Sequence, residues 1–385
     1  MDDPAHRPSF VRVGTSLAVQ AHRAVAEAIA TIDPEDARFV LAFIPKSLDL
    51  GDMLSALDAH LEGTPVFGCT TAGQITGNGY ESQALLLLGF PKANFRCAST
   101  LFEPLNPIHI TGISAQAKRL SDRFVHTAGW NRMGLVFTDG LSKQEDLLIS
   151  ALNLALDDLP VFGGSAGDGL EFVETFVLHD KQFHSDAALL LLLETNLGFQ
   201  GLGFDHFLPA ETQVVVTQAD PGERLVYEIN GAPAAQEYAR LVGCDEHDLS
   251  PLVFAENPML VEHYENHYVR AISGAVGDHA LCFLAAIDDG LVMSLGKGRE
   301  IIKTLDESLA VYDQTGAAPD FILGFDCVLR KLEIQQKQMS GAVSSIFRSR
   351  RVFGFNTYGE QHRGMHMNQT FVGVAFFAQD MGAFS

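Results

Sequence analysis

PVFGGSAGD, at residues 160–168, is the stretch from which the fold of this 385-residue chain can be worked out. Before it, residues 133–138 are a short apolar run typical of a buried strand, and residues 144–156 place leucines and alanines at helical spacing. After it, residues 187–193 form a second apolar run, which suits a strand buried on both faces and is too short to cross a membrane. This order predicts a unit of strand, helix, glycine-rich polar loop and strand.

The same unit occurs three times along the chain. Residues 39–90 contain PVFGCTTAGQ at 65–74, and residues 321–377 contain VFGFNTYGE at 352–360. A recurring internal order of this kind indicates one repeated supersecondary structure. The glycines permit a close approach of backbone segments. We therefore predict an α/β fold in which repeated strand–helix–strand units form mixed β-sheets flanked by helices.

The polar side chains of the three loops are candidates for a binding site. If the loops converge, their hydroxyl and amide groups can hold a small polar ligand. If they do not, the same groups cap their own turns, and symmetry alone explains the repetition. The candidate pocket residues, which are the hydroxyl-bearing loop residues and one following amide, are Thr70, Thr71, Ser165, Thr357 and Asn368.

The segment between the second and third units does not follow the repeat. It has the pattern of further strands and of a helix at about 233–242, and the repeat ends near residues 204–211. We therefore expect two domains. The N-terminal domain covers residues 1–207 and contains two internal repeats, and the C-terminal domain covers residues 208–385.

Charge and cysteine content argue against several classes of protein. The chain has 26 Lys and Arg against 48 Asp and Glu, a net charge of −22, which repels a phosphate backbone, so we expect no nucleic-acid partner. Five scattered cysteines without a CxxC pair predict free thiols in a reducing cytoplasm rather than disulfides or structural zinc. The N-terminus has no signal-peptide pattern, so we expect a cytoplasmic protein that does not bind a membrane.

Familiar catalytic motifs are absent from the sequence. It has no GxxxxGK[ST] and no HExxH, and residues 68–73 do not form a GxSxG elbow. Kinase, cyclase and DNA-binding signatures are absent as well. We therefore expect that the chain is not an enzyme and that its output passes through a protein surface. An enzyme of unrecognised chemistry is the weakest hypothesis left open.

Several motifs in a fixed order resemble the FIST sensory domain, in both its N-terminal and its C-terminal parts, over nearly the whole chain. They are GCTTAGQI (68–75), PVFGGSAGDG (160–169), RLVYEINGAPAAQEYARLVG (224–243), AAIDDGLVM (285–293), GFDCVLRKLE (324–333), FNTYGEQ (355–361) and MHMNQTFVG (365–373). Within this family, the C-terminal motifs and the lack of an attached effector domain resemble the NosP-type subgroup of stand-alone sensors.

The resemblance implies a haem-binding nitric oxide sensor with non-covalent haem b. It also implies a partner that the sensor regulates by direct contact, either the histidine kinase of a two-component system or a diguanylate cyclase or phosphodiesterase of cyclic-di-GMP. His206 is the first candidate iron ligand, because it lies at the predicted domain junction between phenylalanines. His366, within the C-terminal motif, and His184, before an apolar strand, are the other candidates. Strand edges also make a homodimer possible.

The alternative function is a non-haem module that binds a small polar metabolite, such as an amino acid. In this hypothesis the three loops supply backbone and hydroxyl contacts, and Arg270 or Arg330 receives a carboxylate. His366 would then belong to the metabolite pocket rather than to a haem site.

Overall fold

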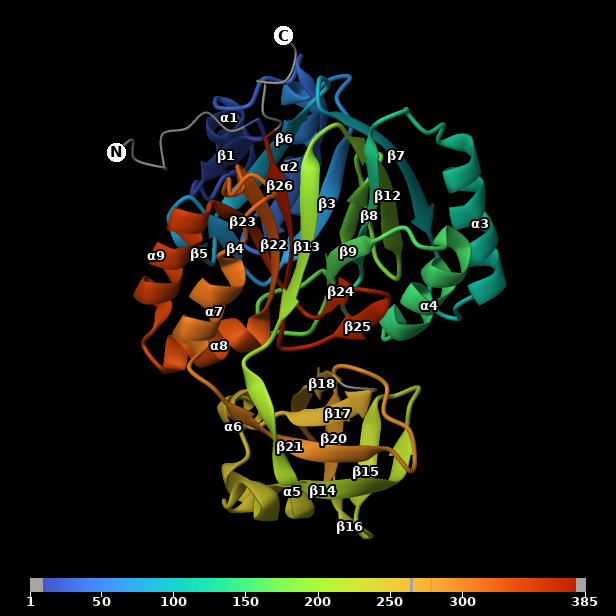
Figure 1. Cartoon of the computed structure of the whole chain (residues 1–385), viewed down its shortest axis with the longest axis vertical. Helices are drawn as coiled ribbons and strands as arrows, with labels where there is room; N and C mark the ends of the chain where they lie inside the picture. Colours follow the sequence, from blue (N-terminus) through green and yellow to red (C-terminus); the bar gives the residue numbers. More distant parts are fainter. Residues whose placement is uncertain (1–9, 264–265, 278, 379–385) are drawn as a thin grey trace.

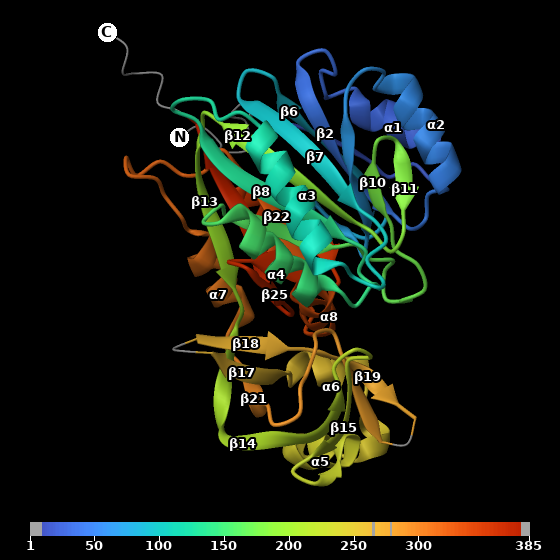
Figure 2. The same ribbon diagram turned by 90° about the vertical axis from the view of Figure 1, so that its right-hand side faces the viewer.

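The structure, a computed structural model, describes residues 10–263, 266–277 and 279–378. It consists of a large α/β body and a smaller domain, mostly of β-strands, that lies below the body in Figures 1 and 2. The smaller domain is inserted into the sequence of the body. No helix among these described residues combines the length and the hydropathy needed to cross a membrane.

The body contains three copies of one unit, each with an outer strand, a helix, two strands joined by a helical connection, a hairpin and a closing strand. The first unit comprises β1 (Arg12–Ser16), α1 (Ala21–Ile29), β2 (Ala37–Pro45), α2 (Leu50–His60), β3 (Val66–Thr71), β4 (Gln74–Thr76), β5 (Gly79–Glu81) and β6 (Leu85–Pro91). The second comprises β7 (Phe95–Phe102), α3 (Ile110–Arg123), β8 (Asn131–Thr138), α4 (Glu145–Leu156), β9 (Val161–Ser165), β10 (Val177–His179), β11 (Gln182–His184) and β12 (Ala188–Thr195). The third comprises β13 (Gly198–Phe204), α7 (Ile301–Leu309), β22 (Phe321–Cys327), α8 (Val328–Gln336), α9 (Ser340–Arg350), β23 (Val352–Thr357), β24 (Glu360–His362), β25 (Met365–Met367) and β26 (Phe371–Phe377).

Each unit completes the sheet of a neighbouring unit. The three six-stranded sheets have the orders β1-β6-β2-β3-β10-β11, β7-β12-β8-β9-β24-β25 and β13-β26-β22-β23-β4-β5. The hairpin of the first unit therefore lies in the sheet of the third, that of the second in the sheet of the first, and that of the third in the sheet of the second. Because the three exchanges close a ring, no unit is complete without the other two.

The glycine of the VFG motif lets the central parallel strands pair closely. Gly68, Gly163 and Gly354 each lie opposite a residue of the preceding parallel strand. A Cβ at any of these positions would lie 1.7–1.9 Å from the carbonyl oxygen of that residue. Contacts this short are not compatible with normal packing, so the motif requires glycine in all three units.

The inner faces of the three sheets share one core. Phe43, Phe137 and Phe325 occupy equivalent positions on β2, β8 and β22, and their rings pack at centroid distances of 5.8 Å (Phe43 to Phe137) and 6.2 Å (Phe137 to Phe325). The outer faces are covered by the helices, which form separate apolar clusters with them. This arrangement confirms the predicted mixed sheets flanked by helices.

The inserted domain separates β13 from α7. It comprises β14 (Phe207–Asp220), β15 (Leu225–Ile229), β16 (Ala232–Pro233), α5 (Ala234–Val242), a 3-10 helix (Glu246–Asp248), α6 (Pro251–Glu256), β17 (Met259–His263), β18 (Asn266–Arg270), β19 (Ile272–Val276), β20 (Ala280–Phe283) and β21 (Val292–Gly298). It has an apolar core of its own. The domain boundary expected at 207/208 falls where β14 begins, whereas the third unit begins before the insertion, at β13.

Candidate functional site

The three glycine-rich loops meet at the centre of the body. Each pair of loops is joined by main-chain hydrogen bonds, so the convergence that the sequence left open is present. Representative bonds run from Ala72 N to Asn356 O (3.0 Å), from Gly167 N to Thr70 O (3.1 Å) and from Ser165 N to Gly359 O (2.8 Å). Because these bonds join main-chain atoms, the side chains near the junction remain available to line a cavity.

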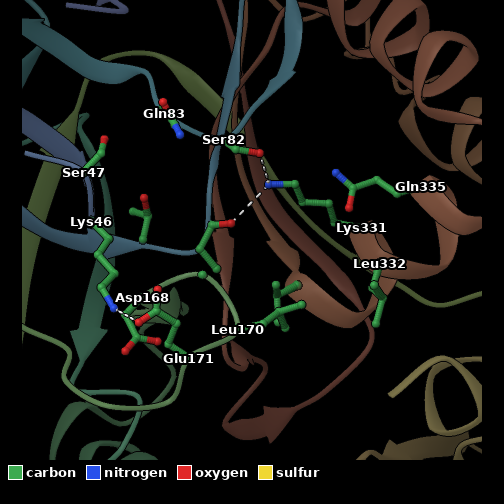
Figure 3. Close-up of a pocket in the computed structure, with 14 residues that line it drawn as sticks. Lys46, Ser47, Ser82, Gln83, Asp168, Leu170, Glu171, Lys331, Leu332 and Gln335 are labelled. Carbon is green, nitrogen blue, oxygen red and sulfur yellow. Dashed lines mark hydrogen bonds and ion pairs between the residues drawn. The ribbon is translucent and has the colours of Figure 1, made fainter. Parts of the chain in front are cut away.

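A cavity of about 490 Å³ lies beside this junction, and all three units contribute to it. The first unit supplies the residues after β2 and β5, the second the loop at 168–171, and the third one face of α8 (Figure 3). A second cavity of about 500 Å³ adjoins it and shares Lys46, Ser47 and Asp168. Both volumes lie within the ~300–1,000 Å³ typical of small-molecule sites.

Lys331 is the buried cation of this cavity. It extends from α8 and is only 5% exposed, and its Nζ donates to Ala72 O at 3.1 Å and to Ser82 Oγ at 3.3 Å. Among the described residues, no carboxylate lies within ion-pair distance of this amine. Burial lowers the pKa of Lys331 to about 8, and the attraction of Asp326 only partly opposes this shift.

Asp168 anchors the loop that borders the cavity. Its carboxylate accepts hydrogen bonds from the Tyr358 hydroxyl and from the amides of residues 172–174, the latter at 2.8–3.0 Å. Burial raises the pKa of Asp168, but these hydrogen bonds outweigh it and leave the pKa below its ordinary value. The carboxylate therefore holds the loop in place, and its oxygens are already used by the protein.

Lys46 stands on the opposite side of the cavity from Lys331 (Figure 3). It forms an ion pair with Glu171, and both side chains are substantially exposed. The hydrogen bond that Lys46 donates to Glu171 raises the pKa of Lys46. The two lysines of one cavity therefore differ, since Lys46 is exposed and paired whereas Lys331 is buried without a carboxylate partner.

Sequence reasoning did not single out either lysine. The sequence led us to expect that Arg330 or Arg270 would bind the carboxylate of a ligand. In the structure, the Arg330 guanidinium donates to Asp326 at 2.8 Å, and Arg270 lies on β18 of the inserted domain. A signal was nevertheless present in the sequence. The cavity-lining residues of α8 have the i, i+3, i+4, i+7 spacing of one helix face, with a lysine between apolar neighbours. They are Val328, Lys331, Leu332 and Gln335.

His206 lies at the junction of body and inserted domain, as expected, but inside a cluster of charged groups. Arg330 can only donate, so Nδ1 of His206 accepts from its guanidinium at 3.2 Å and the Nε2–H donates to Glu333 at 3.1 Å. Burial lowers the pKa of His206 and so favours the neutral imidazole, although the hydrogen bond to Glu333 acts in the opposite direction. Both ring nitrogens are therefore occupied.

His366 and His184 are also held by protein groups. His366 is buried on β25, where Nε2 lies 3.2 Å from Leu284 O of the inserted domain and Nδ1 lies 3.4 Å from the Gln361 amide nitrogen. His184 lies on β11 at the edge of a sheet, with Nδ1 2.9 Å from the Glu103 carboxylate. His366 thus links the body to the inserted domain.

As placed, none of these three histidines faces a described cavity of the size that a haem needs. Haem requires an available imidazole nitrogen that faces a large apolar pocket. Cavities of 170–660 Å³ occur among the described residues, but His206, His366 and His184 line none of those four cavities. Iron ligation would first have to break a hydrogen bond at His206 or His366, whereas His184 is held by the described residues through Nδ1.

The five candidate pocket residues are divided between the cavities and the core. Thr71 lines the cavity beside Lys331, and Thr70 lines the adjoining one. Ser165, Thr357 and Asn368 are fully buried. The Ser165 hydroxyl lies 3.3 Å from a Glu145 oxygen, and Thr357 donates to Glu360, so these loop side chains stabilise the junction from within.

Glu360 is expected to make the stability of the fold depend on pH. Its buried carboxyl group accepts hydrogen bonds from Thr357 and Thr370, yet burial raises its pKa from 4.5 to about 8. Between these values the native chain keeps a proton that the unfolded chain releases, so the free energy of unfolding falls as pH rises from about 4.5 to about 8. We expect Glu360→Gln to remove about 3 kcal/mol of this loss between pH 5 and pH 8, as measured by urea unfolding.

The control for this prediction is Glu62→Gln, at an exposed position, which should follow the wild-type pH profile. If Glu360→Gln and the wild-type protein lose stability in parallel over this range, the proton is not held by Glu360.

Comparison with known families agrees with this architecture. Residues 38–232 match the FIST N domain, and residues 234–363 match the FIST C domain. The first match begins in β2, covers the rest of the first unit and the whole second unit, and runs through β13 into the inserted domain. The second match covers the rest of that domain and most of the third unit. No curated protein matches the chain. With both domains present and the N domain alone covering half its length, the chain belongs to the FIST family, whose domains are sensory domains of signal-transduction proteins.

Proposed function

We propose that this chain is a sensory module, not an enzyme, that binds a small polar metabolite in the cavity beside the loop junction. The observation that carries the proposal is Lys331. Burying an amine without a carboxylate partner lowers the stability of the fold, and such a cost is expected where a ligand supplies the missing partner. The convergence of all three units on the cavity supports the same location.

The groups around the cavity suit a ligand with a carboxylate, such as an amino-acid-like metabolite. Lys331 offers a buried cation, and the side chains of Ser47, Gln83 and Gln335 border the same cavity and can donate or accept hydrogen bonds (Figure 3). Asp168 lines the same cavity as an ionised carboxylate, and the Tyr358 hydroxyl and the loop amides that donate to it offset part of its repulsion of an anionic ligand.

Helix α8 provides a route from this cavity to the inserted domain. Its cavity face carries Lys331, and its other side holds His206 through Arg330 and Glu333. Lys337, just after the helix, pairs with Glu256 of α6 at 3.5 Å. A ligand that binds one position of α8 more tightly than another would therefore shift the docking of the inserted domain. The partner that responds to this shift is a histidine kinase, or a diguanylate cyclase or phosphodiesterase.

The test combines calorimetry against a panel of amino acids and other small carboxylates with a Lys331→Met variant. We expect the variant to lose at least about tenfold in affinity for any ligand found, because a charged hydrogen bond contributes ~1.5–3 kcal/mol. It should also gain about 1–3 kcal/mol in unfolding free energy at pH 7. In the wild-type protein, burial of the charged Lys331 amine lowers the free energy of unfolding at pH values below the native pKa of about 8. This loss disappears as pH rises toward 10.5, where the amine is neutral in the unfolded chain as well.

Lys303→Met, at an exposed position of α7, is the matched control and should change neither quantity. Undiminished ligand affinity in Lys331→Met would count against the proposed site, and silence across the panel would count against the metabolite module.

Haem-based sensing of nitric oxide is the second proposal, supported by the resemblance of the C-terminal motifs to the NosP-type subgroup. It requires His206 or His366 to exchange one of its present hydrogen bonds for iron, or His184 to turn a ring nitrogen toward the haem. The test is the absorption spectrum of the haem-supplemented protein, reduced and then exposed to nitric oxide. A Soret band that shifts with the gas and changes in His206→Ala supports it, and the lack of any band removes it.

A further inference from the structure

We propose that Lys331 captures a 2-oxo acid by forming a reversible imine with its carbonyl carbon. This inference rests on the proposed function, because it assigns a ligand class to the same cavity. Unlike non-covalent binding of a carboxylate, this capture forms a covalent bond between the ligand and Nζ, and that bond can be detected.

The position of the amine suits it for nucleophilic attack. A neutral amine has two N–H donors and one lone pair, and Lys331 has two acceptors within reach, Ala72 O and Ser82 Oγ. A neutral amine that donates both of its hydrogens to these acceptors keeps its lone pair free to attack a carbonyl carbon. Burial lowers the pKa of Lys331 to about 8, so about a tenth of the amine is neutral at pH 7.

The backbone makes room for this amine. A Cβ on Gly73 would lie 2.1 Å from Nζ of Lys331 and 2.9 Å from the Asn356 amide oxygen. Gly73 also has a φ of +133°, which side-chain-bearing residues rarely adopt. The glycine of the first loop therefore leaves the space that Nζ occupies at the cavity wall.

The surroundings of Nζ favour a 2-oxo acid over a simple aldehyde. The imine is protonated near neutral pH and so carries a positive charge, but no protein carboxylate among the described residues lies within ion-pair distance of Nζ. Asp326 acts on Lys331 only through longer-range attraction. A carboxylate next to the ligand carbonyl would supply the missing counter-charge inside the site.

The step conserves atoms and electrons. The ammonium group first gives a proton to water, and the nitrogen lone pair then forms a C–N bond while the carbonyl π bond breaks and its oxygen takes a proton. The nitrogen then gives its extra proton to water, and the carbinolamine hydroxyl takes a second proton and leaves as water while the nitrogen lone pair forms the C=N bond. The result is amine plus carbonyl giving imine plus water, with nothing oxidised or reduced, and hydrolysis reverses it.

Lys46 provides an internal comparison for the test. It lines the same cavity but is exposed and paired with Glu171, which raises its pKa. The full chain is incubated at pH 7 with pyruvate and cyanoborohydride, which reduces an imine to a stable secondary amine, and the labelled peptides are identified by mass spectrometry. We expect labelling of Lys331 to exceed that of Lys46 by about tenfold or more, because a pKa near 8 gives a much larger neutral fraction than an ordinary lysine has.

Two variants separate chemistry from folding. Lys331→Arg keeps the charge and should not be labelled at this position, and Lys331→Met, expected to be more stable than the wild type, should not be labelled either. Acetaldehyde, which lacks the carboxylate, should label Lys331 less selectively than pyruvate. Labelling spread over exposed lysines without preference for Lys331 would overturn the inference. Calorimetric binding of pyruvate without a trapped adduct would also overturn it while leaving the proposed function intact, whereas an adduct at Lys331 supports both.

Discussion

Replacing Gly163 with alanine is expected to destabilise the folded chain by about 3 kcal/mol or more. The new Cβ would lie 1.9 Å from the carbonyl oxygen of Val136 and 2.8 Å from its carbonyl carbon. Backbone atoms of a strand cannot rotate away, and β8 is held on both sides, by β9 and β12. Overpacking of this kind costs ~1–3 kcal/mol where side chains can yield, and more where they cannot. The quantity to measure is the unfolding free energy from urea titration.

The same substitution can be made at the VFG glycine of the other two units. Gly68→Ala and Gly354→Ala place their Cβ atoms equally close to the paired strand, so both should lose at least as much, and Gly68→Ala should lose the most because Gly68 also has a φ of +151°. The control is Gly341→Ala in the first turn of α9, where an added Cβ meets nothing within 4 Å, and we expect a gain of about 0.5 kcal/mol. A loss of under about 1 kcal/mol at Gly163 would mean that the parallel strands can separate without cost.

The VFG repeat made the central part of the fold predictable, because each copy has a buried strand, a helical pattern and a glycine in the same order. The exchange of hairpins was not predictable. β4 and β24 have only three residues each, too few to show a period, and their partners are distant in sequence. Gln74 pairs with Phe355 and Glu360 with Gly164 through the backbone, so no side-chain pattern marks the partner.

The site could be predicted less well, and His206 shows why. Its aromatic neighbours and its place at the junction were visible in the sequence, but the groups that occupy its two ring nitrogens come from α8, more than a hundred residues away. Lys331 could not be recognised from the sequence either, because nothing in its local sequence marks it. Within α8 it is one charged residue in a helix, and only the folded chain shows that this face borders a cavity and lacks a carboxylate partner.

Arg330→Met is expected to lower the unfolding free energy by about 3–5 kcal/mol, the usual cost of removing one partner from a buried ion pair. The Arg330 side chain is 1% exposed, and its guanidinium holds the buried Asp326 carboxylate at 2.8 Å and Nδ1 of His206 at 3.2 Å. Without it, Asp326 keeps the Tyr80 hydroxyl but no cation, and His206 loses the donor that fixes its tautomer. Guanidinium unfolding measures the loss, with the exposed Arg348→Met as the control that should stay within about 0.5 kcal/mol of the wild type.

The same variant separates ligand binding from its transmission. Lys331 is the next residue on α8 but faces the cavity, so Arg330→Met should still bind any ligand that the wild-type protein binds. What should change is the response of the inserted domain. In the wild-type protein, ligand should alter the rate at which a protease cleaves near residues 205–207, and in the variant that ligand dependence should be lost. If the variant keeps both its stability and its ligand-dependent cleavage, the contact between α8 and His206 does not carry the signal, and the coupling must run through another contact such as His366 and Leu284.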